Sequence, residues 1–162
     1  MAFLLLSGCT RGSKNAGITS IPQLQQQVSL DSLALHELKV RYQDPLQADF
    51  LWCDSMLAFV NEQEVEGYFN TLNLAQAYLN QFNAMLPTMN HDIAYLQEQL
   101  TNLQNDLDTH YLNDSLASLY FEDEKAVADT LHHRILYFED KLAQQSMALQ
   151  TLKKNLCKAT AP

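Results

Sequence analysis

Residues 128–156, which read ADTLHHRILYFEDKLAQQSMALQTLKKNL, carry the pattern that decides the fold. With Gln145 as the one polar exception, apolar side chains recur there in a seven-residue repeat, at Ala128, Leu131, Ile135, Phe138, Leu142, Leu149, Leu152 and Leu156. A repeat of this kind places the apolar residues along one stripe of an α-helix. Four sustained heptads predict that this helix packs with a left-handed twist against partner helices.

The same spacing runs through most of the chain upstream of this stretch. Its earlier stripes are Ile21, Leu24, Val28, Leu35, Leu38 and Tyr42, then Leu46, Phe50, Cys53, Leu57 and Val60, and then Val65, Tyr68, Leu72, Ala75, Leu79, Phe82 and Leu86. The first of these stripes includes one acidic residue, Asp31. Leu dominates the apolar set, and Gly and Pro number only four each. We therefore predict an all-α fold, an elongated antiparallel helical bundle of four or five helices.

Local signals place the ends of these helices. Asp44-Pro45 is typical of a helix start, a phase slip at Asn61–Glu64 predicts a break or bend, and Asn113-Asp114-Ser115 supplies the last N-cap. Pro87 interrupts a continuous apolar phase, which fits either a kinked helix or a tight hairpin. We predict the hairpin, at Leu86–Asn90, and expect a single bundle domain over residues 21–158.

The charge distribution excludes one class of partner. The chain has 19 Asp and Glu against 10 Lys and Arg, a formal net charge of −9. No Lys or Arg lies between Arg41 and Lys125, a stretch that holds fourteen of the acidic residues. Such a surface repels phosphate backbones, so we expect no nucleic-acid partner.

Residues 1–9 read MAFLLLSGC, an apolar run that ends in small residues and a cysteine. Leu6-Ser7-Gly8-Cys9 resembles the lipobox of bacterial lipoproteins, and the chain as a whole resembles small helical envelope lipoproteins of Gram-negative bacteria. The resemblance implies that Cys9 is lipidated, and Thr10 in place of Asp implies an outer-membrane location facing the periplasm. The apolar run is short and lacks a positive start, which either a start codon upstream of Met1 or a trimmed N-terminus would explain.

Residues 1–20 are thus interpreted as a truncated signal and lipidation segment followed by a flexible tether. The part from Thr10 to Ser20 contains Gly12, Ser13, Asn15 and Gly17 and little that could pack in a core. The alternative is a short tail on a cytosolic protein. No apolar run in the sequence approaches the 18 residues or so of a membrane-spanning helix.

The sequence lacks the usual signatures of catalysis and cofactor binding, so we predict no enzyme activity and no cofactor. The histidines are His36, His91, His110, His132 and His133. A di-iron bundle needs paired Glu-x-x-His motifs, whereas this chain offers one Asp-x-x-His, from Asp129 to His132. We expect surface or helix-end histidines, with His110, which lies on the apolar phase, the most buried.

Two further sets of residues have two interpretations each. Trp52, Phe69 and Tyr78 lie just off the apolar stripes and form either part of the core or an exposed patch that docks a partner. Cys53 and Cys157 remain as an even pair once Cys9 is modified, so they form either a disulfide or two free thiols.

These observations favour a non-enzymatic envelope lipoprotein that presents helical surfaces for protein–protein interaction. Its partners would be another envelope protein or a second copy of itself, and it would reach the membrane through the lipid on Cys9. A periplasmic binder of a small apolar ligand or an unfolded chain is the first alternative, and a cytosolic coiled-coil adaptor is the second.

Overall fold

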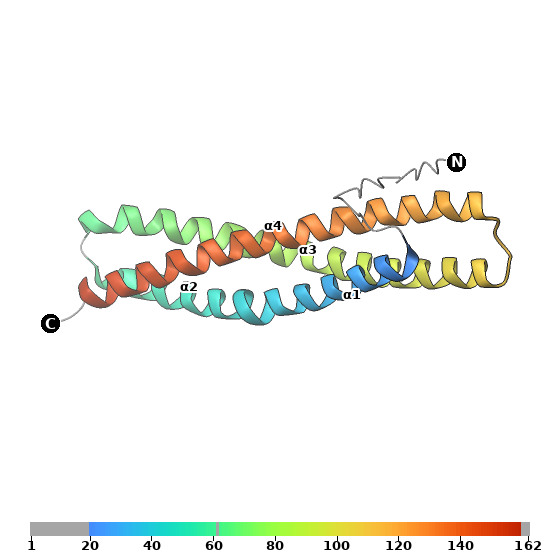
Figure 1. Cartoon of the computed structure of the whole chain (residues 1–162). Helices are drawn as coiled ribbons and strands as arrows, with labels where there is room; N and C mark the ends of the chain where they lie inside the picture. The colour runs from blue at the N-terminus through green and yellow to red at the C-terminus, as the bar shows by residue number, and fades with distance from the viewer. Residues whose placement is uncertain (1–19, 61, 160–162) are drawn as a thin grey trace, which may run out of the picture.

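A computed structural model describes residues 20–60 and 62–159 of the chain, and this part contains helices and no strand (Figure 1). The α-helices are α1 (Ile21–Leu38), α2 (Asp44–Met56), α3 (Glu62–Asp108) and α4 (Asp114–Ala159), with a π-helical turn η1 (Lys39–Gln43) and a 3₁₀ turn η2 (Leu57–Phe59). The predicted all-α class is confirmed. The lipobox, Cys9 and nearly all of the tether lie outside the described residues.

The prediction of four or five helices is wrong, because the described residues form three long helical paths. The first path comprises α1, η1 and α2, through which the backbone stays helical. Asp44 does begin α2, with Pro45 in its first turn where a missing N–H costs nothing, but the chain does not reverse there. The other two paths are α3 and α4.

The π-helical turn η1 corrects a shift in the apolar pattern. Buried residues of α1 alternate at intervals of three and four up to Leu38, but the next buried positions are Leu46 and Phe50. A strict heptad would have placed the first of these one residue earlier. A π turn accommodates one extra residue, so the buried stripe stays on the same side of the path.

The predicted hairpin at Leu86–Asn90 is also wrong, since α3 runs without interruption through Pro87. Pro87 and Asn83 are both exposed, so water can satisfy the Asn83 carbonyl that loses its helical donor. The Asn90 side chain donates a hydrogen bond to the Leu86 carbonyl at 3.0 Å. Because the apolar repeat continues with the same phase before and after Pro87, the same face of α3 is buried along the whole helix.

The chain reverses at the other two predicted places. After η2, Val60 adopts an extended conformation, with φ −102° and ψ 149°, and α3 begins at Glu62. The second reversal lies between Asp108 and Asp114, where the Asn113 side-chain oxygen accepts a hydrogen bond of 3.0 Å from the Leu116 N–H. This is the N-cap that the sequence predicts for α4.

The three paths lie side by side along the long direction of the molecule (Figure 1). The first path runs in the same direction as α4, since Asp31 contacts His132 and, further along both, Cys53 contacts Leu149. Helix α3 runs opposite to both. The core is the predicted stripe: on α4 the buried residues are Ala117, Ala128, Leu131, Ile135, Phe138, Leu142, Gln145, Leu149, Leu152 and Leu156. Within residues 20–60 and 62–159, no helix is apolar over enough of its length to cross a bilayer.

Candidate functional site

One acidic residue lies within the apolar stripe of α1. Asp31 falls between Val28 and Leu35 in the repeat, and it is only 2% exposed. A buried carboxylate is costly unless it is paired and hydrogen-bonded, so its surroundings are the first place to look for a site.

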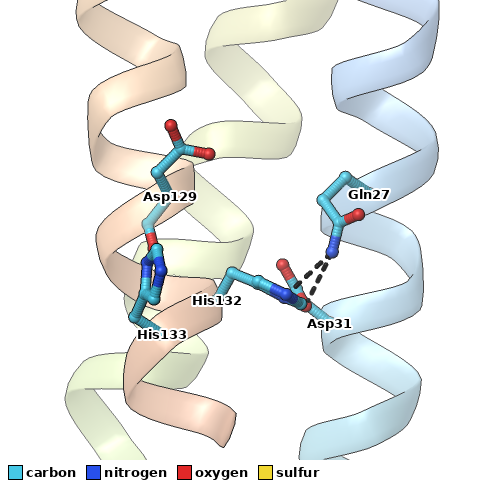
Figure 2. Close-up of polar contacts among 5 residues, drawn as sticks. All are labelled: Gln27, Asp31, Asp129, His132 and His133. Atoms are coloured by element: carbon cyan, nitrogen blue, oxygen red, sulfur yellow. Dashed lines mark hydrogen bonds and ion pairs between the residues drawn. The ribbon is translucent and has the colours of Figure 1, made fainter. Parts of the chain in front are cut away.

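Asp31 is paired with His132, a residue of α4 that follows the core residue Leu131 (Figure 2). The distance from His132 Nδ1 to Asp31 Oδ1 is 2.7 Å. The Gln27 side-chain amide donates to the same oxygen at 3.1 Å and lies 3.0 Å from His132 Nδ1. His132 Nδ1 and Gln27 Nε2 thus both lie within hydrogen-bonding distance of one carboxylate oxygen.

The contacts of this cluster join α1 to α4. An Asp–His pair in a nucleophilic enzyme needs a hydroxyl or thiol within hydrogen-bonding reach of the imidazole. None of the hydrogen bonds among the described residues links such a group to His132. The second oxygen of Asp31, Oδ2, is buried and has no hydrogen-bond partner in this part of the chain. The cluster therefore fixes the position of α1 against α4.

The histidine predictions need correction. His110, predicted to be the most buried, is exposed, because α3 has already ended and the residue adopts a left-handed conformation with φ 56°. His132, predicted at the surface, is half-buried in the contact with Asp31. The signal for this pair was Asp31 on the apolar stripe, but sequence spacing alone gave no reason to choose His132 as its partner.

Asp129 takes no part in the cluster. Its side chain points away from Asp31 and His132 in Figure 2, and its backbone carbonyl contacts His133 Nδ1 at 2.7 Å. Over the described residues, no three potential metal-ligating side chains gather at one point.

The three candidate docking aromatics do not form one patch. Phe69 and Tyr78 are nine residues apart on α3, which is two and a half turns, so they project from opposite sides of that helix. Trp52 lies on α2, half-buried, with Lys153 Nζ 5.2 Å from its ring centroid. Among the three, only Phe69 counts as exposed, at 46%.

Cys53 and Cys157 are both free thiols in the structure. Cys53 is fully buried, and its Sγ lies 3.9 Å from the carbonyl oxygen of Leu149, two turns of α4 before Cys157. Two turns correspond to about 11 Å of rise along the helix, more than the ~7 Å between Cα atoms that a disulfide tolerates. Burial, with a smaller contribution from Asp49, raises the pKa of the Cys53 thiol to about 11.

Comparison of this chain with protein-family models, with curated proteins and with solved structures finds no significant match.

Proposed function

We propose that this chain is a non-enzymatic lipoprotein of the bacterial envelope, held at the outer membrane by a lipid on Cys9 and facing the periplasm. In this proposal the three helical paths form an elongated antiparallel bundle. Its task is to present an apolar helix surface to another protein of the envelope.

The observation that carries this proposal is an apolar stripe on the outer side of the first path, formed by Leu30, Leu33, Val40 and Leu51. These residues are 53%, 63%, 57% and 57% exposed. Leu30, Leu33 and Val40 are spaced by three and seven residues, so they project from the same side of the first path. Leu51 lies beyond the π turn, on α2. Single exposed leucines are ordinary, but several large apolar residues on the outer side of one helical path support an interaction surface.

Polar residues beside the stripe suit a helix from a partner. A shallow cavity of about 410 Å³ is lined by His36, Glu37, Val40 and Arg41. Charges of both signs at the edge of an apolar surface favour one orientation of a partner over others. An amphipathic helix that binds in such a groove places its own apolar residues at i, i+3 and i+7.

The interaction surface is tested by photo-crosslinking in cells, with a photoreactive amino acid at position 33 or 40 of the full chain. We expect a discrete cross-linked product from these positions and none from position 97 on the exposed side of α3. The matched substitution Leu33→Glu should remove the product formed from position 40. Equal products from all three positions, or none, would contradict the proposal.

The anchor is tested separately. With a complete signal in front of it, the Cys9→Ala variant should leave the membrane fraction and become soluble. Unchanged membrane association of this variant would reject lipidation at Cys9, whatever the outcome of the cross-linking.

Two measurements distinguish the proposal from the ligand-binding alternative. Species that grow with concentration in analytical ultracentrifugation would support association through the stripe, provided that Leu33→Glu abolishes them. A monomer that carries a tightly held apolar molecule in native mass spectrometry would favour a binder of apolar ligands instead.

A further inference from the structure

A second feature, unrelated to the apolar stripe, lies at the end of the molecule where α3 turns into α4 (Figure 1). There the two helices and their loop enclose a pocket of about 300 Å³. The pocket is lined by Gln99, Asn102, Asp106, Tyr111, Tyr120 and Glu124, with Leu103 and Leu112 at its base.

The end of α3 places one of these tyrosines. His110 adopts a left-handed conformation, and the N–H groups of the next two residues both donate to the Asp106 carbonyl, Tyr111 at 2.9 Å and Leu112 at 3.3 Å. This pattern closes the C-terminus of a helix. It brings Tyr111 back over the last turn of α3, where its ring, 81% exposed, lines the pocket beside Asp106.

The charge at this end is strongly one-sided. Between positions 98 and 124 the chain has no Lys or Arg, and its acidic residues are Glu98, Asp106, Asp108, Asp114, Glu122, Asp123 and Glu124. The two nearest basic residues along α4 already have acidic neighbours, because Lys125 lies 4.0 Å from Glu122 and Arg134 lies 3.2 Å from Asp92. The pocket is therefore in a negative field that attracts cations.

Glu124 is one of the two acidic residues that line the pocket. Its Oε2 atom is buried and has no hydrogen-bond partner among the described residues. Burial and the neighbouring carboxylate of Asp123 raise the pKa of Glu124, while a hydrogen bond from Tyr95 opposes the rise. Glu124 lines the pocket, so its negative charge, rather than this buried oxygen, would attract a cation there.

We propose that this pocket binds an organic cation of the alkylammonium class, held against Tyr111 and Tyr120 and neutralised by Asp106 and Glu124. Aromatic rings attract such cations through their negative faces, and methylated ammonium groups favour them most because their hydration is weak. A metal ion fits the pocket less well, since calcium takes six to eight oxygen ligands and the lining holds two carboxylates. The volume suffices for a group of the size of choline.

The test is a titration of the full chain with choline, followed by the NMR signals of the tyrosine rings or by calorimetry. The control ligand is 3,3-dimethylbutan-1-ol, which has the shape of choline without its charge. We expect the alcohol to bind at least about tenfold more weakly than choline, because an ion–ring attraction is absent. Equal affinities for the two ligands would overturn the proposal.

Variants locate the site. Tyr120→Leu and Glu124→Gln should each weaken choline binding about fivefold, the effect of losing one cation–ring or charge contact at a partly exposed site. Tyr137→Leu, at another exposed tyrosine of α4 outside the pocket, should leave the affinity unchanged. If Tyr120→Leu unfolds the chain in circular dichroism, Tyr111→Leu replaces it, since that ring packs into no core. Unchanged binding in the folded variants, or equal loss in Tyr137→Leu, would overturn the proposal.

The source of the ammonium group is settled by co-sedimentation with phosphatidylcholine vesicles. Vesicle binding that Tyr111→Leu abolishes would assign the ligand as a lipid headgroup, whereas choline binding without vesicle binding would assign a free molecule. The proposal would be overturned if the chain fails to bind choline and the pocket variants bind vesicles as well as the wild type does. None of these results depends on Leu33, so failure here and failure of the protein-interaction surface are distinguishable.

Discussion

Helices α3 and α4 meet in two different ways along their length. In the middle of the molecule, Phe82 and Phe138 are 0% and 1% exposed, and their rings pack edge to face with centroids 5.2 Å apart. Towards the loop, the same helices line a pocket that includes the exposed rings of Tyr111 and Tyr120 and the carboxylates of Asp106 and Glu124. The middle carries stability, because large apolar side chains are removed from water there. The loop end contributes little burial and is therefore free to carry a binding site.

The largest effect is expected from a substitution in the middle. Phe138→Ala removes most of a fully buried ring and its contact with Phe82, so we expect a loss of about 3–5 kcal/mol in the free energy of unfolding. Urea denaturation followed by circular dichroism measures it. The matched control Tyr137→Ala, on the exposed side of the same turn, should cost less than about 1 kcal/mol. Equal losses would show that the middle is not the stabilising region.

The reactivity of the Cys53 and Cys157 thiols is a second test of burial. Because the pKa of the Cys53 thiol is raised to about 11, its thiolate fraction at neutral pH is about 100-fold below that of an ordinary cysteine. In the native protein, Ellman's reagent should react with the exposed Cys157 and leave Cys53 unmodified. After oxidation and denaturation, two reactive thiols besides Cys9 should appear. The absence of any reactive thiol besides Cys9 in that sample would instead support a Cys53–Cys157 disulfide.

The pair of Asp31 and His132 is the polar exception within the stable region. His132→Ala leaves the buried Asp31 side chain without its partner on α4, so we expect a loss of about 2 kcal/mol in the free energy of unfolding. This is less than the value for a fully buried pair, because His132 is partly exposed. The double variant Asp31→Leu/His132→Leu should recover most of this loss, and His133→Ala should be within about 0.5 kcal/mol of wild type. If the double variant is less stable than His132→Ala, the pair adds to the free energy of unfolding and does more than fix the position of α1 against α4.

At the loop end, His110 adopts a conformation that suits glycine better than any side chain. His110→Gly should therefore stabilise the protein by about 0.5–1 kcal/mol, which thermal unfolding detects. His110→Ala retains the strain and serves as the control. A loss of stability in the glycine variant would indicate that the histidine side chain makes a contact worth more than the strain.

The smallest effect concerns Glu124 and depends on pH. Its pKa is raised in the folded protein by burial and by Asp123, so the folded state holds this proton more tightly than the unfolded chain does. The stabilisation is therefore present in acid and is lost as the pH rises through the raised pKa. Glu124→Gln should stabilise the protein at neutral pH by less than about 0.5 kcal/mol, because solvent screens a group this exposed.

The gain from Glu124→Gln should vanish in acid, where the wild-type carboxyl is already protonated. Glu98→Gln, at an exposed residue of the same end, is the control and should change stability little at either pH. A gain that persists unchanged in acid would exclude ionisation of Glu124 as its cause.

The sequence by itself determined which residues face the core, since helical periodicity is a local property that neighbouring residues express directly. Asp31 and Gln145 are both buried at the positions where the stripe places them. It also determined where two helices end, because the phase slip after Val60 and the cap at Asn113 are local signals, whereas the reversal of the chain at both places was not predicted. The hairpin predicted at Pro87 was wrong because the cost of a proline within a helix depends on whether that side of the helix faces solvent or the core.

The tertiary structure alone decided which side chains meet across helices. Asp31 and His132 are 101 residues apart, and nothing near either residue specifies the other. Tyr111 and Tyr120 became lining residues only through the way α3 ends and α4 begins. Cys53 and Cys157 came to the same end of the molecule, yet the packing of α2 on α4 sets their separation. Such contacts depend on the relative position of whole helices, which is the sum of many weak packing interactions rather than of any one motif.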